Sequence, residues 1–530
     1  MDSTGERICK RQTALNALKS PHVDVWRRCF DHTFPLRGSG FYGDTVTAED
    51  GLSKRARLTD STATDAVRML ASQIMDGMTP ANAIWFELDV GDESDAEKRW
   101  LSDAAKFIWE NIHNSNFDSV GFESIIDVIC AGFFIMFIDE AKDGGYLFAE
   151  WPIAECSVAS SVAGGPVDTV YRSFEYTAEQ AVSAYGDDVS EDIKKAIADN
   201  KGDTKFKFVH AIEPRKNFVV NAKLAKNMPF ASVHVEEKTK KTVRESGFHE
   251  FPCAVPRWMM IPGSAYAVGP VYDALPDISM INEVKRMELA SLDLAIAGMW
   301  VAEDDGVLNP GTIKIGARKV IVANSVDSIK PLQTGADFHV AFMSEDRIQM
   351  QIRKMLLADH LQPQDGPQMT ATEVHVRVQM VRQLLGPIYG RFQSEYLQPL
   401  IERCFGIALR AGALGPAPES LRDRDYNIKY VSPLARAQKL EEVNAIDQWV
   451  AGTAAYAEIA PQALDIIDFD AATRVKAEAY GVPNKAIRNQ DDTADVRVQR
   501  EEQEQEQQQQ QIAGEVAAEG GKAAVKQALG

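Results

Sequence analysis

The sequence predicts an α+β fold in which helical segments flank one β-rich stretch. Residues 146–258 consist of short alternating apolar runs separated by turn residues, a pattern typical of an antiparallel sheet. The segments on either side carry apolar residues at helical spacing, most clearly in the pair 271–299 and 338–357. This long hairpin presents more apolar surface than the rest of one chain can obviously cover. We therefore expect copies of the chain to pack side by side.

The composition limits the classes of function. A chain of 530 residues, 45% hydrophobic and 25% charged, is typical of a soluble protein with two to four domains. The net charge of −20 argues against a free-standing DNA binder, which would cluster Lys and Arg on one surface. Six cysteines without a close pair predict reduced thiols and no disulfide framework. The N-terminus has no apolar signal core, and the longest apolar run, 128–138, is far shorter than the ~20 residues that span a bilayer. We expect a cytoplasmic site of synthesis.

The N-terminal third is expected to be mainly helical. Asp60 or Ser61 can cap a helix that stops at Thr79-Pro80, since both residues accept hydrogen bonds from free backbone N–H groups. The other expected elements are a helix over 5–34, a glycine-rich loop over 37–44, a strand over 83–88, a helix over 96–114 and a helix, or a helix running into a strand, over 122–137.

The middle third is expected to form an antiparallel sheet interrupted by one helix near 178–199. Its clearest strands are 170–174, 206–210 and 231–235.

A helical hairpin follows. Its first helix carries Ile278, Ile281, Val284, Met287 and Leu292 on one stripe, and Pro276 lies in its first turns, where proline is best tolerated. The insert 300–333 contains Asn309-Pro310-Gly311 and the short runs 313–315 and 320–322, which indicate a small β unit. The second helix, 338–357, carries Ile348, Ile352, Met355 and Leu356.

A third helix begins with a clear start signal. Residues 362–368 contain two prolines and a glycine, which break helicity. Thr370 and Glu373 then form a capping box, in which each side chain can bond the backbone N–H of the other. Apolar spacing continues to Phe405, and Gly386-Pro387 is expected to kink the helix.

No catalytic motif fits its required context. Residues 38–43 match G-x-G-x-x-G, but they follow a helix instead of a strand, and no helix starts at Gly43. No G-x-x-x-x-G-K-[ST] motif occurs. Asp359, His360 and His375 lack the spacing of metal ligands, and Glu303-Asp304-Asp305 is better explained as a solvated turn. We expect no enzyme activity, no cofactor and no metal.

Three groups of residues, in chain order, resemble one family. The first group is the segment 29–35 together with the sequence AVRMLASQIM at 66–75 and Trp85. The second is the sequence AYAVG at 265–269. The third is the sequence MTATEV at 369–374, followed by Leu384, Gly386, Tyr389 and the sequence LQPL at 397–400. The chain resembles the portal proteins, or head-to-tail connectors, of short-tailed double-stranded DNA bacteriophages, over most of residues 10–480. It departs from them at Pro387 and in its glutamine-rich tail.

The resemblance implies a ring of twelve subunits at one capsid vertex, with a portal fold of α/β wing, two-helix stem, small β-containing clip, long kinked tunnel helix and helical crown. The implied divisions are the wing 1–268, stem helices 269–299 and 334–358 around the clip 300–333, the tunnel loop 359–369, the kinked helix 370–432, the crown 433–500 and a tail 501–530. Residues 501–511 of that tail are wholly Glu and Gln. The sequence leaves open whether the tail is helical or disordered.

The resemblance also implies partners and a location. Double-stranded DNA would be packaged by the terminase motor through the ring and later ejected. The implied protein partners are the terminase large subunit, tail adaptor or nozzle proteins, the major capsid protein and internal core proteins, with no membrane. The protein would belong to the virion and assemble in the host cytoplasm. The alternative is a ring-forming capsid or tail adaptor, or scaffold, that does not itself conduct DNA.

The net negative charge suits a channel, because an acidic wall leaves passing DNA mobile. A few cations would position the duplex, and each of these residues has the alternative of a solvated charge or an inter-subunit ion pair. The stem candidates are Lys285, Arg286, Arg347, Arg353 and Lys354; the clip candidates for motor or tail contact are Lys314, Arg318, Lys319 and Lys330. The tunnel-loop candidates are Asp359, His360, Gln362, Gln364, Asp365 and Gln368, with functionless mobility as the alternative.

Overall fold

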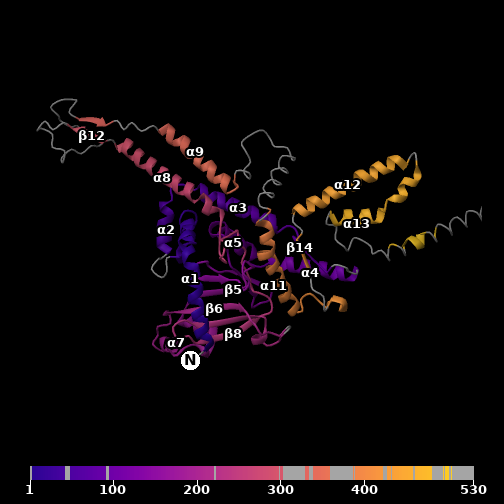
Figure 1. The fold of residues 1–530 in the computed structure, drawn as a ribbon, viewed down its shortest axis with the longest axis horizontal. Coiled ribbons are helices and arrows are strands. Elements are labelled where there is room, and N and C mark those ends of the chain that lie inside the picture. The colour runs from indigo at the N-terminus through magenta and orange to yellow at the C-terminus, as the bar shows by residue number, and fades with distance from the viewer. Residues whose placement is uncertain are drawn as a thin grey trace, which may run out of the picture. The chain divides into compact units, whose positions relative to one another are not determined.

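A computed structural model gives the structure of the chain (Figure 1). It describes residues 3–41, 48–90, 95–219, 222–297, 299–302, 329–332, 338–358, 386, 388–421, 427–430, 433–457, 460–479, 493, 496–500 and 503. The chain divides into a larger unit, Met1–Ala83 with Phe107–Gly415, and a smaller unit, Ile84–Lys106 with Pro416–Gly530. The mixed helix and sheet content confirms the predicted α+β class.

The larger unit contains a five-stranded antiparallel sheet of order β4-β5-β6-β7-β8. Its strands are β4 (Cys156–Ala159), β5 (Thr169–Thr177), β6 (Lys205–Pro214), β7 (Phe230–Glu236) and β8 (Thr242–Phe248). The antiparallel sheet predicted for the middle third is therefore confirmed. The single helix predicted over 178–199 is wrong, because two short helices occur there, α6 (Ala178–Tyr185) and α7 (Glu191–Ala198). Gly186, at φ 61°, ends the first of them.

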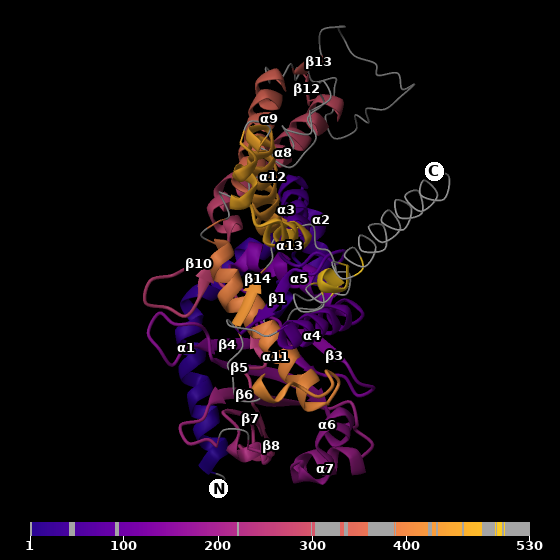
Figure 2. The ribbon, with the colours of Figure 1, turned by 90° about the vertical axis from the view of Figure 1, so that its right-hand side faces the viewer.

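The two faces of this sheet are covered differently. Strand residues alternate between faces, so Tyr171, Val209 and Val233 pack with Ile8 and Leu15 of α1 (Ser3–Asp31) on one face. On the other face Phe208 packs with α6 and α7 through Ala181 and Ile193. Figure 2 shows α1 running along the sheet. The helices α6 and α7 therefore cover only part of the second face of the sheet.

A buried helix lies at the centre of the larger unit. The predicted helix running into a strand is confirmed as α5 (Phe117–Ala131) followed by β2 (Met136–Glu140). Gly132, at φ 94°, makes the join. A Cβ atom there would lie 2.3 Å from the carbonyl carbon of Val268, so only glycine fits. Strand β2 pairs with β3 (Tyr146–Glu150) and with β9 (Cys253–Ala254), and a further pair joins β10 (Met259–Met260) to β11 (Ala267–Val268).

Helix α5 packs against α1, α3 (Thr62–Met78) and α8 (Pro270–Ala297). Asp60 caps the start of α3, where its Oδ1 accepts the N–H of Thr62 at 2.9 Å; Ser61 makes no such cap. Helix α2 (Ala48–Arg57) precedes α3 and was not predicted. Its sequence, AEDGLSKRAR, is mostly hydrophilic and therefore shows little of the apolar periodicity from which a helix is predicted.

The predicted helical hairpin is present as α8 and α9 (Phe338–Met355), which lie side by side in Figure 1. Between them β12 (Met299–Ala302) pairs antiparallel with β13 (Ile329–Leu332), at the two ends of the insert. The predicted runs 313–315 and 320–322, the loop 359–369, the capping box 370–373 and Pro387 lie outside the described residues.

The described part of the third helix contains a feature that the sequence did not reveal. Residues Gln393–Leu397 form a π-helical turn that leads into α11 (Gln398–Arg410). This wider turn puts three consecutive residues, Glu395, Tyr396 and Leu397, in the interior. Glu395 accepts three hydrogen bonds from Arg257: from its backbone N–H and from Nε, both at 3.1 Å, and from Nη2 at 2.5 Å. The Arg257 side chain is 2% exposed and also donates to the Gly165 carbonyl at 2.8 Å.

The smaller unit contains the antiparallel pair β1 (Phe86–Asp89) and β14 (Asn427–Tyr430). The predicted helix over 96–114 is α4 (Asp95–His113), and the C-terminal helices are α12 (Pro433–Ala457) and α13 (Phe469–Ala479), which pack together.

Short 3₁₀ turns in the two units are η2 (Gly186–Asp188), η3 (Ala225–Asn227), η8 (Glu419–Leu421) and η9 (Pro461–Ile466). Among the described residues, no helix combines the length and apolar character needed to cross a membrane.

We predict that Arg257→Met destabilises the protein by about 3–5 kcal/mol, because the carboxylate of Glu395 is then buried without its counter-charge. Urea unfolding followed by tryptophan fluorescence measures the change. Lys238→Ala is the control, since its ion pair with Asp192 lies on the surface, and it should leave the midpoint unchanged. Equal midpoints for the two variants would contradict the role of the buried pair.

Candidate functional site

The hairpin α8–α9 is the first candidate surface, because it holds the predicted stem cations. Ile278 and Ile281 of α8, Ile348 and Ile352 of α9, and Leu356 just after α9 are buried, as the predicted stripe requires. Other members of that stripe are not covered: Met287 is 57% exposed and Met355 is 46% exposed. Neighbouring Met280, Leu289 and Met350 are also exposed. The hairpin therefore buries one apolar face within the chain and leaves part of another uncovered.

A layer of hydrogen bonds attaches the hairpin to the segment before α3. The side-chain Oδ1 of Asn282 accepts the N–H groups of Thr59 at 3.0 Å and Asp60 at 3.2 Å. From α9, Gln349 Nε2 donates to Asp60 Oδ2 at 3.0 Å. These contacts hold α8 and α9 against one short loop, so the base of the hairpin has a defined position in the larger unit.

The stem cations divide into paired and unpaired groups. Lys285 forms ion pairs with Glu345 of α9 and with Glu288 at 3.7 Å. Burial lowers the pKa of Lys285, but the two carboxylates outweigh it and the net shift is upward. Arg286 pairs with Glu283 on the surface of α8 at 2.6 Å. Lys285 and Arg286 are thus neutralised within the chain.

The remaining stem cations lie on α9. The side chains of Arg347, Arg353 and Lys354 form no ion pair or hydrogen bond with another described residue. Arg347 and Lys354 are seven residues apart and exposed, so they lie on one face of α9, two turns from each other. These three residues are the stem cations available to a ligand.

The other predicted residues lie largely outside the described chain. Lys330 is in β13, opposite Val301 of β12. Lys314, Arg318 and Lys319 of the insert lie outside the described residues, as do all six tunnel-loop candidates, Asp359, His360, Gln362, Gln364, Asp365 and Gln368.

The glycine-rich segment has a structural role in its described part. Arg37 donates to Asp127 at 2.6 Å and to Glu150 at 2.5 Å, and so joins this segment to α5 and β3. A Cβ atom at Gly38 would lie 2.7 Å from Cβ of Phe30. The segment follows α1 and no strand, so the dinucleotide-binding geometry is missing here. Nowhere in the described chain do three or more His, Cys, Asp or Glu residues come together as they would to bind a metal ion.

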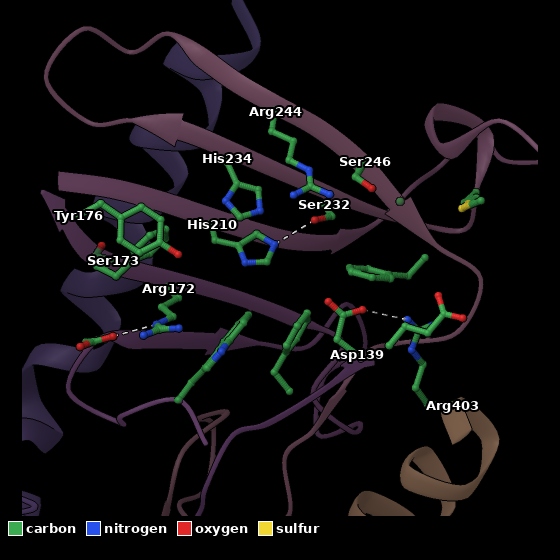
Figure 3. Close-up of a pocket in the computed structure, with 18 of the residues that line it drawn as sticks. Asp139, Arg172, Ser173, Tyr176, His210, Ser232, His234, Arg244, Ser246 and Arg403 are labelled. Atoms are coloured by element: carbon green, nitrogen blue, oxygen red, sulfur yellow. Dashed lines mark hydrogen bonds and ion pairs between the residues drawn. The ribbon is translucent and has the colours of Figure 1, made fainter. Parts of the chain in front are cut away.

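A large hollow among the described residues was not predicted. It lies on the face of the five-stranded sheet opposite α1, has a volume of about 1020 Å³ and is bordered by β2 and α11. Figure 3 shows two arginines and two histidines, Arg172, His210, His234 and Arg244, lined up across it. Around them lie Ser232, Ser246 and Tyr176.

The two histidines form a stacked pair, with ring centroids 3.8 Å apart and planes 19° apart. His210 Nε2 bonds Ser232 Oγ at 2.9 Å, and His234 Nδ1 bonds the Tyr185 hydroxyl at 3.0 Å. Burial lowers the pKa of both; the neighbouring Arg244 adds to the effect, and the pKa of His234 falls to about 4. The pair is therefore neutral at pH 7.

Comparison with known proteins decides the family. A family model described as bacteriophage head to tail connecting protein matches residues 6–487. The chain belongs to this family. The resemblance inferred from the sequence is confirmed.

Two relatives of the connector match along nearly their whole length. The probable portal protein of Bordetella phage BPP-1 is 27% identical over 514 residues, which cover 93% of this chain and 90% of that protein. The portal protein of Salmonella phage epsilon15 is 27% identical over 538 residues, covering 98% and 94%. A chain from the neck of an empty GTA particle, solved with C6 symmetry, aligns with a TM-score of 0.37 and 13% identity over 76% of this chain and 90% of that one. That last likeness is too weak to support a conclusion.

We predict that Lys285 and Glu345 of the connector stabilise the hairpin jointly. In a double-mutant cycle of Lys285→Ala and Glu345→Ala, we expect a coupling of about 0.5–1 kcal/mol, because the pair joins two helices and is partly buried. Urea unfolding of the four proteins gives the coupling. The same cycle on the exposed pair Arg286 and Glu283 is the control and should show no coupling. Coupling in the control alone would refute the prediction.

Proposed function

We propose that this connector is a portal, a ring at one capsid vertex through which double-stranded DNA is packaged by the terminase motor and later ejected. The tail would attach to the same ring. The observation that carries the proposal is the end-to-end match to two phage portal proteins, each covered over at least nine-tenths of its length.

The exposed apolar residues of the hairpin support self-association. Met280, Met287 and Leu289 of α8 and Met350 and Met355 of α9 are all at least 46% exposed. A ring covers such residues, because each subunit packs its hairpin against the next and the last closes on the first. We propose twelve subunits, as the resemblance implies.

Each segment has a proposed place in the ring. The wing would comprise residues 1–268, the stem 269–299 and 334–358, the clip 300–333, the tunnel loop 359–369, the kinked helix 370–432 and the crown 433–500, followed by the tail 501–530. The motor and tail proteins would meet the clip, and the capsid and internal core proteins the wing and crown.

The charges suit a channel in which DNA must stay mobile. The net charge of −20 repels phosphates, so the duplex is not held at one place. Arg347, Arg353 and Lys354 are the stem cations without a described counter-charge, and we propose that they are the ones that position the DNA. Lys285 and Arg286 would act within the subunit through Glu345 and Glu283.

The second candidate is a ring-forming adaptor or scaffold between head and tail that does not conduct DNA. The family description supports it equally well, because connecting head to tail does not by itself require DNA to pass. The DNA content of assembled heads separates the two candidates.

We predict that the purified protein forms closed rings with an axial hole. Negative-stain electron microscopy and native mass spectrometry test this. Replacing Met287, Leu289 and Met350 by Ser should shift the mass toward the single subunit, since it removes apolar contact between copies. Replacing Arg286 by Gln is the matched surface control and should leave rings intact. A wild-type chain that stays monomeric under all conditions contradicts the proposal.

We predict that deleting residues 361–368 leaves the ring intact and reduces the DNA in the heads, because the proposed tunnel loop approaches the duplex. Gel electrophoresis of DNA extracted from purified heads gives the amount, and electron microscopy checks the ring. Lys238→Ala, in the proposed wing, is the control and should give full heads. Full heads with the deletion would count against the tunnel-loop assignment, and a loss of rings would show that the segment serves assembly.

A further inference from the structure

Four nitrogen-bearing side chains form one straight row across the sheet. The strand registers place Arg172 of β5 opposite His210 of β6, His210 opposite His234 of β7, and His234 opposite Arg244 of β8. Directly paired residues on neighbouring strands point to the same face. With strands about 4.8 Å apart, the row is roughly 14 Å long. It crosses the hollow shown in Figure 3.

The row is an array of hydrogen-bond donors held in place by neighbours. Arg172 is fixed by Glu155, which accepts from its Nε at 2.8 Å, and by the rings of Trp151 and Phe174, each 5.2 Å from its guanidinium carbon. Its two terminal nitrogens make no hydrogen bond to another described residue. They remain available to a ligand in the hollow.

The other end of the row has no counter-charge among the described residues. Arg244 is exposed and forms no ion pair there. Three of the four carboxylates that line the hollow already face cations: Glu155 pairs with Arg172, Glu175 with Lys207 and Asp139 with Arg403. The fourth is Glu140. The stretch from His210 to Arg244 therefore offers donors without a matching acceptor charge.

We propose that this row is a binding site for a phosphate group. A phosphate presents three strong acceptor oxygens and up to two negative charges. The stretch from His210 to Arg244 offers it one guanidinium group, two imidazoles and the hydroxyl of Ser246, and Arg172 adds positive charge at the far end of the row. A carboxylate has fewer oxygens for the same donors. The group can come from free inorganic phosphate or from a phosphate monoester. This inference does not depend on the channel proposal.

The histidine pair couples binding to pH. Arg172 and Arg244 in the row and Tyr185 from α6 lie next to the pair. The other titratable and charged groups that line the hollow are Asp139, Glu140, Glu155, Glu175, Tyr176, Lys207, His249, Arg403 and Arg410. Without a ligand, burial lowers the pKa of both histidines, with a further contribution from Arg244 at both and from Arg172 at His210, so both are neutral at pH 7. A bound anion favours their protonated forms and raises these pKa values. Affinity for an anion of constant charge should therefore rise as the pH falls.

Isothermal titration calorimetry on the full chain tests the site, with inorganic phosphate as the probe and ionic strength held constant with chloride. We expect saturable binding of one phosphate per chain. Arg244→Gln should weaken it at least about tenfold, the effect of losing one charge-assisted hydrogen bond. Lys238→Gln, which removes the same charge from an exposed position beyond β7, is the matched control and should change the affinity less than about twofold. Circular dichroism checks that each variant is folded.

Two further titrations make the result specific. Sulfate, a dianion across this range, should bind more tightly at about pH 5 than at about pH 8, and His234→Gln should remove that difference. O-phosphoserine identifies the source: binding tighter than inorganic phosphate indicates a monoester, and equal or weaker binding indicates the free ion. Absence of saturable phosphate binding, equal losses in the Arg244 and Lys238 variants, or acetate binding as tightly as phosphate would each overturn the proposal.

Discussion

The burial of the C-terminal half of α5 is the constraint on which the rest of the larger unit depends. Helices α1, α3 and α8 and strands β3 and β11 all pack against it. The eight residues Ser124–Ala131 at its C-terminal end are all buried, and six of them have no more than 1% exposure. An apolar helix of this kind is stable only inside a shell of other elements. The sheet and the hairpin are therefore held through a common centre.

Charged groups then fix the elements that the apolar centre does not orient. Arg257 holds the π-helical turn through Glu395, and Arg403 and Arg410 of α11 both donate to Glu250, at 3.1 Å and 2.5 Å. The Arg257–Glu395 group contacts the π-helical turn just before α11, and the Glu250 group contacts α11 itself. Because buried charges require good geometry to be tolerated, such groups admit few alternative positions of the helix.

Sequence patterns predicted the elements with regular periodicity. The strands around 170–174, 206–210 and 231–235, the helix that runs into β2 and the hairpin α8–α9 follow from alternation or from helical spacing. The hydrophilic α2 has no such signal, and Gly186 divides the expected single helix in two. The row of Arg172, His210, His234 and Arg244 is invisible in the sequence for another reason: its members are 38, 24 and 10 positions apart and become neighbours only through the strand register. Of the predicted site residues, the structure places those on α8 and α9 and, in β13, Lys330.

The outer strand β8 has a consequence for how copies of the chain can meet. Gly247 lies so close to η3 that a Cβ atom would be 2.2 Å from the Ala225 carbonyl oxygen, and Arg215 donates to the Ser246 carbonyl at 3.0 Å. At the opposite margin β4 has only four residues. Both margins thus resist the addition of a strand from another molecule, which is a common route to open-ended aggregates. Within one chain the five-stranded sheet therefore ends at β4 and β8, and open-ended pairing of such sheets between copies is disfavoured.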